Sequence, residues 1–382
     1  MELVYLDNNA TTRPDPQVVQ AMSLYLSQYW GNPSSAHRFG QRCRQGIDEA
    51  RAQLAALLSV RDSELTFTGS GTEATNTALR GLLAGRAPRT KIITTAVEHS
   101  ATREMCQQLA KEGAEVVLLP VSPEGDLDPA AVAEALSDDV AFVSTLWANN
   151  ETGVLFDVAE IARICRDKGV PYHVDATQAV GKIPVDLSAL GVDAATIAAH
   201  KFHGPKGIGA LYVRRGLRIR PWLIGGPQER GKRGGTENVA GIVGMGKAAE
   251  LALAHLPQMQ RVAEQRDRFE EEVTELIPDT MVIGNRSNRL PNTASIGFAH
   301  LEAEAILMLL SEQGICASAG AACSSGSLEP SHVLKAMAVP EVFAHGAIRF
   351  SLGRFTTDSE LDIAVATLPG VIERLRSVLP VG

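Results

Sequence analysis

Residues 193–207 read Asp-Ala-Ala-Thr-Ile-Ala-Ala-His-Lys-Phe-His-Gly-Pro-Lys-Gly, an apolar run that ends in a lysine and a glycine-rich turn. The run at 193–199 predicts a β-strand, with Lys201 just beyond its end. A shorter apolar run, at 172–175, precedes it and ends in an acid. Both runs are continuous rather than alternating, which is typical of strands buried on both faces of a sheet. This part of the sequence therefore predicts an α/β fold with charged residues at the strand ends.

Short β-rich runs alternate with helical patterns on both sides of this stretch. Further strands are expected at 64–68, 91–95, 116–119, 140–146 and 208–214, and helices at 72–84, 101–112 and 158–168. The last of these helices is followed by Gly169, a residue type that commonly ends a helix. Strands separated by helices favour a mostly parallel sheet. We therefore expect one mostly parallel, seven-stranded sheet flanked by helices.

The pattern changes near residue 256. A long charged helix is expected at 256–276, and it is suited to connect two domains. The strands expected after it, at 292–298 and 347–352, would belong to a smaller α+β unit. At roughly 150 residues per domain, a chain of 382 residues accommodates two domains. We expect a large domain at 15–255 and a small domain formed by 1–14 and 256–382.

Composition and charge exclude several classes of protein. Hydrophobic residues make up 45% and charged residues 21% of the chain, which excludes a disordered or collagen-like protein. The net charge of −8, from 36 basic and 44 acidic residues, argues against nucleic acid as a partner. No signal peptide is apparent, and no apolar run approaches the ~18 residues of a membrane span. We therefore expect a cytoplasmic protein that binds neither nucleic acid nor membrane.

The five cysteines indicate a reducing compartment. Their number is odd and no pair has Cys-x-x-Cys spacing, so neither a disulfide framework nor a structural zinc site is expected. Cys165 and Cys316 lie in apolar periodic stretches and fit buried structural positions. Cys323 differs, because it lies in a cluster of small residues at 317–327, Ala-Ser-Ala-Gly-Ala-Ala-Cys-Ser-Ser-Gly-Ser. Few bulky anchors predict a mobile, accessible segment, and its thiol could act as a nucleophile.

A glycine-containing turn at 68–73, Thr-Gly-Ser-Gly-Thr-Glu, lies between an expected strand and an expected helix. Backbone N–H groups at a helix N-terminus bind phosphate, and a glycine allows close approach of the backbone. Gly71 and Thr72 are therefore candidate phosphate ligands. Ser70 and Thr72 are also ordinary capping residues, so a simple helix cap is the alternative interpretation.

Two charged residues follow neighbouring strands. Asp175 is expected at the carboxyl edge of the sheet, where it could hold a protonated heterocyclic nitrogen or simply cap a helix. Lys201 lies 26 residues later and could be a nucleophilic amine if it is partly desolvated, or an exposed lysine. A phosphate site, an acid and a lysine together are what pyridoxal 5′-phosphate requires. His99 could place an imidazole over the cofactor ring or be a structural histidine.

An arginine lies on the strand expected near the C-terminal end, in Ile-Arg-Phe-Ser-Leu-Gly-Arg at 348–354. Arg349 could clamp a substrate carboxylate in a bidentate fork. The alternative is a surface ion pair, for which Arg354 is better suited than Arg349.

The sequence resembles the cysteine desulfurases of the pyridoxal-phosphate fold-type I class, and the NifS group most closely. The resemblance covers essentially the whole chain. The matching motifs are LDNNATT at 6–12, GNPSS at 31–35, WANNETG at 147–153, HVDATQ at 173–178, HK at 200–201, RGKRGGTEN at 230–238, CSSGSLEPSH at 323–332 and RFSL at 349–352. So many ordered matches are highly specific. They imply an enzyme that converts L-cysteine to L-alanine and an enzyme-bound persulfide.

The resemblance implies cofactor-binding roles for individual residues. Lys201 would hold pyridoxal phosphate as a Schiff base, and Asp175 would pair with its pyridinium nitrogen. His99 would stack on the ring and serve in proton transfer, and Gln178 would bond the phenolic oxygen. The residues that would hold the phosphate are Gly71, Thr72, His200 and, reaching across a homodimer to the neighbouring subunit's phosphate, Thr236.

The resemblance also implies how the substrate would be bound. Asn150 would lie near the ring and the substrate, and Arg349, with Asn32, would bind the cysteine carboxylate. Cys323 would attack the substrate sulfur, become a persulfide and could transiently ligate an iron–sulfur cluster during sulfur handover. The implied partners are L-cysteine and an iron–sulfur scaffold or another sulfur-acceptor protein.

Two positions depart from the family pattern. Ala198-Ala199 stand where the family has Ser-Gly, and a hydroxyl bonded to the phosphate is worth about 1.5–3 kcal/mol. The segment around Cys323 reads Ala-Ala-Cys-Ser-Ser rather than Ser-Ala-Cys-Thr-Ser, with the thiol intact. The absence of a C-terminal tail after Gly382, with the motif at 147–153, favours a NifS-type supply of nitrogenase clusters. A housekeeping IscS-type desulfurase, or a selenocysteine lyase or aminotransferase of this fold, is the alternative.

Overall fold

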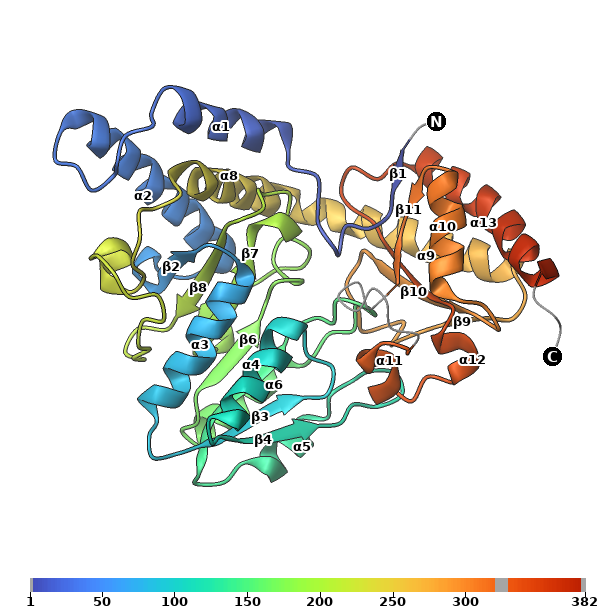
Figure 1. The fold of residues 1–382 in the computed structure, drawn as a ribbon, viewed down its shortest axis with the longest axis horizontal. Helices are drawn as coiled ribbons and strands as arrows, with labels where there is room; N and C mark the ends of the chain where they lie inside the picture. Colours follow the sequence, from blue (N-terminus) through green and yellow to red (C-terminus); the bar gives the residue numbers. More distant parts are fainter. Residues whose placement is uncertain (1–2, 320–328, 379–382) are drawn as a thin grey trace.

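The computed structural model describes residues 3–319 and 329–378, and its largest feature is a seven-stranded sheet (Figure 1). The strands lie in the order β2-β8-β7-β6-β5-β3-β4. Their bounds are β2 Leu65–Thr68, β3 Lys91–Thr95, β4 Glu115–Leu119, β5 Val140–Leu146, β6 Tyr172–Asp175, β7 Ala194–Ala198 and β8 Gly209–Val213. All neighbouring pairs from β4 to β7 are parallel, and β8 runs antiparallel to β2 and β7. The prediction of a mostly parallel, seven-stranded sheet is confirmed.

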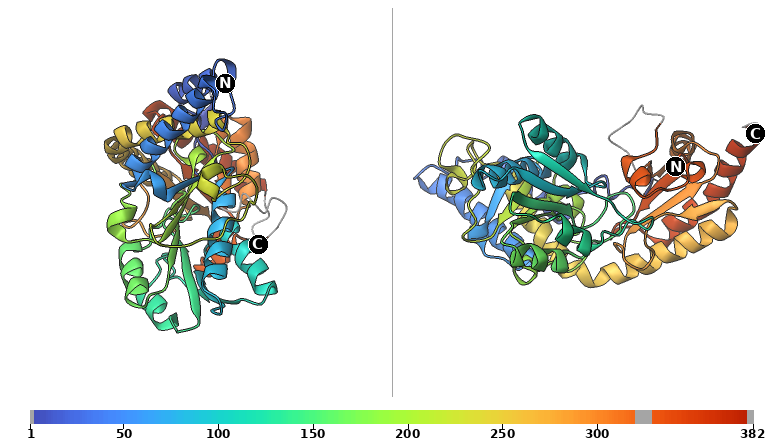
Figure 2. Two further views of the ribbon diagram at one scale, coloured as in Figure 1. Left: turned by 90° about the vertical axis from the view of Figure 1, so that its left-hand side faces the viewer. Right: turned by 90° about the horizontal axis from the view of Figure 1, so that it is seen from below.

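Helices cover both faces of this sheet (Figures 1 and 2). Their bounds are α1 Pro16–Ser27, α2 Arg38–Leu58, α3 Gly71–Gly85, α4 Ser100–Lys111, α5 Pro129–Ala135, α6 Val158–Asp167, α7 Leu187–Leu190 and α8 Val239–His255. On one face, α3 and α4 bury a cluster that includes Leu79 and Phe142. On the other face, α2, α6 and α8 bury a larger cluster that includes Ile161, Val174 and Met245. Burial on both faces explains the continuous apolar runs of the strands.

The ends of the expected strands and helices agree with the structure to within one residue, except that the helix expected at 256–276 begins at Met259, after a 3-10 turn at Leu256–Gln258. Glu64, expected to begin a strand, lies instead in a 3-10 turn, η1 Asp62–Glu64, because its carboxylate accepts a hydrogen bond from the backbone N–H of Arg61. Gly169 follows α6 with a φ of +64°, a left-handed conformation that favours glycine. The predicted stop of this helix is therefore confirmed.

A second sheet has four antiparallel strands in the order β12-β13-β10-β9. Their bounds are β9 Thr280–Val282, β10 Thr293–Phe298, β12 Ser318–Ala319 and β13 Ala347–Ser351. The helices of this part are α9 Met259–Leu276, α10 Ala303–Glu312, α11 His332–Ala336, α12 Glu341–Ala344 and α13 Asp358–Val378. Phe269 of α9, Phe298 and Phe350 belong to its buried core. The strands expected at 292–298 and 347–352 are β10 and β13.

The N-terminal residues pack with this second sheet rather than with the first. Strand β1 Val4–Tyr5 pairs in parallel with β11 Ile315–Cys316, and Val4 and Leu6 are buried in the same core as Phe350. The helical run from α8 through the 3-10 turn η4 Leu256–Gln258 to α9 passes from the large sheet to the small one (Figure 2). The predicted domain limits at 14/15 and 255/256 stay a prediction.

One helical run of the described residues, Val239–Leu276, is long and apolar enough to cross a membrane by length and composition. Of its most apolar stretch, 56% is buried inside the fold. Small residues allow this packing: a Cβ added at Gly246 would lie 2.4 Å from the Cα of Ala50 in α2. Lys247 and Glu250 interrupt this run, so it is not a continuous apolar stretch of the kind that the sequence lacks.

Two expectations about individual side chains also change. Arg354 is not a surface residue, because its guanidinium pairs with Asp15 and both side chains are buried, 6% and 8% exposed. Cys165 is buried as expected, together with Cys43 and Cys106, whereas Cys316 is only half-buried. Among the described residues, no group of three or more His, Cys, Asp and Glu side chains is placed to hold a metal ion.

Candidate active site

A pocket of about 670 Å³ lies at the carboxyl ends of β6 and β7. It is lined by the N-terminal segment, by the start of α3 and by residues of the second sheet. The predicted site residues that line it are Gly71, Thr72, His99, Asn150, Asp175, Gln178, His200, Lys201 and Arg349. The structure therefore brings together residues that lie up to 278 positions apart, since 349 − 71 = 278.

Three predicted residues are not among those that line this pocket. Asn32 is exposed, and its Oδ1 accepts a hydrogen bond from the backbone N–H of Ser34 at 2.9 Å. Thr236 lines a separate cavity of about 110 Å³, together with Gly69. Cys323 lies outside the described residues. The role of Thr236 requires a second subunit, so this role, like that of Asn32, stays a prediction.

The start of α3 forms one end of the pocket. Ser70 caps this 15-residue helix, because its Oγ accepts a hydrogen bond from the backbone N–H of Glu73 at 3.0 Å. The capping interpretation is therefore confirmed for Ser70, while Gly71 and Thr72 face the pocket. A Cβ added at Gly71 would lie 3.2 Å from the Cβ of Ala198, so a larger residue would crowd this end. The free N–H groups and the helix dipole make it an anion site.

Lys201 ends the 3-10 turn η2 Ala199–Lys201, directly after β7, and is half-buried rather than exposed. Its Nζ donates hydrogen bonds to the carbonyl oxygens of Asn9, at 2.5 Å, and Ala10, at 2.9 Å. The N-terminal segment therefore holds the amine at the pocket wall. Asn9 belongs to the motif at 6–12, but the sequence analysis assigned it no role of its own.

The charged partner on the neighbouring strand is also placed at the pocket. Asp175 is 8% exposed, and its Oδ1 accepts a hydrogen bond from the backbone N–H of Thr177 at 3.0 Å. This contact forms a turn, and no helix begins after Asp175, so the alternative interpretation as a helix cap is not borne out. Because the carboxylate has two oxygens and also lines the pocket, this contact leaves acceptor capacity for a ligand.

His99 caps α4, because its Nδ1 accepts a hydrogen bond from the backbone N–H of Ala101 at 3.2 Å. Burial lowers the pKa of this imidazole, and Lys201 and Arg103 lower it further against the opposing effect of Asp175. A neutral imidazole that accepts at Nδ1 carries its proton on Nε2. His99 can therefore donate a hydrogen bond from Nε2.

His200 is a second neutral histidine at the pocket. Burial, helped by the nearby ammonium groups of Lys201 and Lys206, lowers its pKa to about 4. Its Nδ1 lies 3.2 Å from the Oγ1 of Thr11. The imidazole is therefore uncharged at neutral pH, and it would bind a phosphate by hydrogen bonding rather than by an ion pair.

Arg349 enters the pocket from β13 and is 3% exposed. Its guanidinium donates to the carbonyl oxygen of Asn150 at 2.9 Å and to the Asp7 carboxylate at 2.9 Å. The interpretation of Arg349 as a surface residue is excluded. Two partners, one in the N-terminal segment and one after β5, fix the direction of its fork, which suits recognition of a carboxylate.

Several buried ionisable groups near the pocket were missed by the sequence analysis. Glu98 is 1% exposed; its Oε1 accepts from Thr95 Oγ1 at 2.7 Å and from the Leu146 backbone N–H at 3.0 Å. Burial raises the pKa of Glu98 to about 8. Glu151 is likewise buried, and it accepts a hydrogen bond from the Ser331 hydroxyl at 2.6 Å. The sequence signal that could have identified these two acids is their position in or beside a motif: Glu98 precedes His99, and Glu151 lies in the motif at 147–153.

The donor set fits pyridoxal phosphate. A helix N-terminus with a tight approach at Gly71 suits the phosphate, and the Asp175 carboxylate suits a protonated ring nitrogen. Lys201 offers an amine at the wall, and the imidazole of His99 lines the same cavity. Phosphate site, acid, amine and aromatic neighbour together are the requirements of this cofactor. The combination defines a pyridoxal-phosphate-dependent enzyme.

Comparisons with known proteins identify the family. The aminotransferase class-V family matches residues 4–363. A cysteine desulfurase of Enterobacter agglomerans is 53% identical over 381 residues, covering 100% of this chain and 95% of that protein. The cysteine desulfurase NifS of Azotobacter vinelandii is 49% identical over 379 residues, covering 99% and 94%. The chain therefore belongs to the cysteine desulfurases of the class-V aminotransferase family.

A solved structure supports the same conclusion for the fold. A NifS-like protein superposes with a TM-score of 0.92 at 37% sequence identity, and the match covers 98% of this chain and 100% of that one. The predicted resemblance to the NifS group and the prediction of a pyridoxal-phosphate fold of type I are both confirmed. Members of this family use pyridoxal phosphate, which confirms the predicted cofactor.

Proposed function

We propose that this chain is a cysteine desulfurase that converts L-cysteine to L-alanine and receives the sulfur on Cys323. The observation that carries the proposal is the convergence of Lys201, Asp175 and Arg349 on one pocket at the start of α3. A relative at 53% identity that bears the name cysteine desulfurase supports it. The predicted persulfide would then supply sulfur for iron–sulfur clusters.

The substrate is held and deprotonated by residues of both sheets. Arg349 binds the carboxylate of L-cysteine with its fork, beside Asn150. Pyridoxal phosphate, when bound, supplies an electron sink for the pair released at the substrate Cα. Lys201 takes the proton from that carbon. The neutral imidazole of His99 carries its proton on Nε2 and donates a hydrogen bond from there toward the pocket.

The transfer of sulfur from L-cysteine to Cys323 requires no reactant other than the substrate and the enzyme thiol. The Cys323 thiolate attacks the substrate sulfur, so an S–S bond forms while the bond from that sulfur to the substrate Cβ breaks. The electron pair of the broken bond stays with the carbon skeleton, which takes up protons and leaves as L-alanine. L-Cysteine and an enzyme thiol thus become L-alanine and an enzyme persulfide.

The direct test is product analysis with the cofactor-loaded enzyme. L-Cysteine should give L-alanine and, in the presence of a thiol reductant, sulfide in equal amounts. An aminotransferase would instead require an oxo-acid acceptor and leave the sulfur on its product. A selenocysteine lyase would act on selenocysteine and leave L-cysteine unreacted. Either of these results would contradict the proposal.

The proposal also includes the physiological acceptor of the sulfur. The similarity to NifS supports a role in supplying nitrogenase clusters, through an iron–sulfur scaffold and with Cys323 as a transient cluster ligand. Expression in a nitrogen-fixing bacterium that lacks its own NifS should restore growth on N2. Rescue of growth on fixed nitrogen in a strain lacking a housekeeping desulfurase, without rescue on N2, would favour the IscS-type alternative.

The homodimer and the cytoplasmic location are part of the same proposal. The location of Thr236 away from this chain's own pocket suits a residue that serves the neighbouring subunit. Sedimentation should give twice the mass of the 40.7 kDa chain. Substitution Thr236→Val should weaken cofactor retention, and a monomer with full cofactor affinity would contradict the dimeric site. Fractionation of the native cells should place the protein in the cytoplasm.

A further inference from the structure

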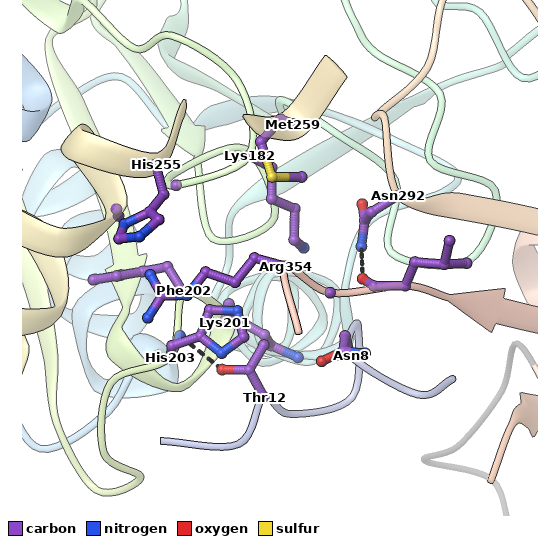
Figure 3. A pocket seen from close by; sticks show the side chains of 14 residues that line it. Asn8, Thr12, Lys182, Lys201, Phe202, His203, His255, Met259, Asn292 and Arg354 are labelled. Carbon is purple, nitrogen blue, oxygen red and sulfur yellow. Dashed lines mark hydrogen bonds between the residues drawn. The ribbon is translucent and has the colours of Figure 1, made fainter. Parts of the chain in front are cut away.

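A buried lysine that the sequence analysis did not single out lies behind the pocket. Lys182 is 6% exposed and lines a cavity of about 20 Å³, room for one water molecule (Figure 3). Lys201 lines this small cavity as well as the main pocket. Lysine is rarely buried without polar partners, because desolvation disfavours its charge. The partners of Lys182 therefore indicate what the residue is for.

The ammonium group of Lys182 is bound by two amide oxygens. Its Nζ donates to the Oε1 of Gln178 at 2.5 Å and to the Oδ1 of Asn9 at 3.2 Å. Gln178 in turn donates from Nε2 to the carbonyl oxygen of Asn9 at 3.0 Å. The same carbonyl oxygen accepts the bond from Lys201. Three side chains, those of Lys182, Gln178 and Lys201, are therefore linked through one asparagine.

The chemistry of lysine decides the orientation of the glutamine amide. A side-chain amide can bind in two orientations that differ by exchange of its oxygen and nitrogen. Lys182 donates to both oxygens, so the Oε1 of Gln178 must point toward it. The Nε2 then points the other way, toward Asn9 and the pocket that Gln178 lines. One of its N–H groups bonds to Asn9, which leaves the second for a ligand.

We propose that Lys182 is a positioning residue that locks the amide of Gln178 so that it presents an N–H group to the pocket. Through Asn9, the same contact holds the carbonyl oxygen that binds Lys201. The inference rests on the proposed function and on the role that the family resemblance implies for Gln178, a bond to the phenolic oxygen of pyridoxal phosphate. A donor suits that oxygen because its reactive form is anionic.

The electrostatic surroundings of Lys182 do not reverse this orientation. Burial, with the positive charges of Lys201 and Arg349, lowers its pKa well below the usual value. The other titratable or charged side chains around the small cavity are His203, His255 and Arg354. Whether the amine carries three protons or two, it has enough N–H groups to donate to both amide oxygens. The glutamine is therefore held in the same orientation in both protonation states.

The test is a pH titration of the visible absorbance band of the cofactor-loaded enzyme, a readout independent of turnover. In Lys182→Met, Gln178 can turn its oxygen toward the pocket, and the anionic phenolic oxygen loses its donor. The pH midpoint of the titration should rise by about one unit, which corresponds to the free energy of one charge-assisted hydrogen bond. The matched control Lys91→Met, on β3 of the same sheet, should leave the midpoint unchanged. An unchanged or lower midpoint in Lys182→Met would overturn the proposal.

A double-mutant cycle separates positioning from a general structural effect. Gln178→Leu should raise the midpoint as much as Lys182→Met does, and adding Lys182→Met to it should give no further shift. An equal further shift in the double variant would show that Lys182 acts without Gln178, which overturns the proposal. If Lys182→Met does not fold, the same titration is carried out with Lys182→Gln instead. Its amide can accept as well as donate, so the expected result is a smaller upward shift, and no shift overturns the proposal.

The same experiment distinguishes this inference from the proposed function. If the wild-type enzyme shows no visible band that borohydride reduction fixes on Lys201, the proposed function fails. If the band is present and Lys182→Met leaves its midpoint unchanged, the proposed function stands and only the role of Lys182 is overturned.

Discussion

The two walls of the pocket are built in different ways. The wall on the large sheet consists of residues at or just beyond the ends of strands, such as Gly71, Asp175 and Lys201, and each is placed by its own strand and turn. The opposite wall joins the N-terminal segment to the second sheet. There, Arg349 is held by Asp7, 342 positions away in the chain. The first wall depends on local structure, and the second exists only when the two ends of the chain come together.

This difference separates two tasks of the enzyme. The residues predicted to bind the cofactor lie mainly on the locally built wall, and Arg349, predicted to bind the substrate carboxylate, lies on the assembled one. Substitutions in the first wall should therefore act on cofactor binding, and those in the second on substrate recognition. Substitutions of the residues that link the two walls should lower the free energy of unfolding.

The largest effect is expected on the first wall, from Lys201→Ala. Loss of the amine removes both the covalent attachment and the base, so desulfurase activity should fall by a factor on the order of 10³ or more. Borohydride reduction followed by peptide mass spectrometry should no longer find cofactor on the chain. The control Lys168→Ala, at an exposed residue after α6, should retain both properties. Substantial activity in Lys201→Ala would break the assignment of this wall.

On the second wall, Arg349→Ala should raise KM for L-cysteine by about 100-fold, because charge-assisted hydrogen bonds contribute about 1.5–3 kcal/mol each. The visible cofactor band should be retained. Arg349→Lys keeps the charge but not the fork, so an intermediate KM is expected. Loss of the cofactor together with substrate binding would show that the two walls are not separable.

The link between the walls is tested by Asn9→Ala. The Asn9 side chain donates to Thr293 Oγ1 at 2.9 Å and accepts from Asn292 and Lys182. Removing it leaves buried donors without an acceptor, at a cost of about 1–3 kcal/mol in the free energy of unfolding. Urea denaturation of the cofactor-free protein measures this. A variant as stable as the wild type would contradict the role of Asn9 as a link.

Within the first wall, Ala198→Ser should strengthen cofactor binding. Ala198 lies opposite Gly71 at the anion site, and a hydroxyl there would add one hydrogen bond to the phosphate, which lowers the dissociation constant about tenfold or more. Equilibrium dialysis against free pyridoxal phosphate measures the constant. Ala194→Ser, four residues earlier on the same strand, is the control. Unchanged affinity would mean that this hydroxyl is not needed in this chain.

A further prediction concerns the pH dependence of stability. The pKa of Glu98 is raised by burial to about 8, so the folded state holds a proton that the unfolded state has already lost above about pH 4.5. Its contribution to stability is complete below that pH and falls by about 1.4 kcal/mol per pH unit until about pH 8. Glu98→Gln should make unfolding less pH-dependent between pH 5 and 8. Equal slopes in denaturation curves would contradict the buried proton.

The same comparison explains what could be predicted from the sequence. Asp175 and Lys201 were found because each ends an apolar strand, and the sheet edge follows from that pattern. The roles of Lys182 and Asn9 were missed, because they arise from a contact between residues 173 positions apart. Arg354 was misassigned for the same reason, since its partner Asp15 lies at the other end of the chain. Burial of a charge depends on tertiary packing, which a local pattern does not contain.

The central claim is that the sulfur of L-cysteine passes to the thiol of Cys323 while Lys201 holds the cofactor. The most direct measurement compares alanine and sulfide release from L-cysteine by the wild type and Cys323→Ala, with the visible cofactor spectrum recorded for both. The account predicts the wild-type spectrum in the variant and loss of both products. Alanine and sulfide release at the wild-type rate in Cys323→Ala would contradict it.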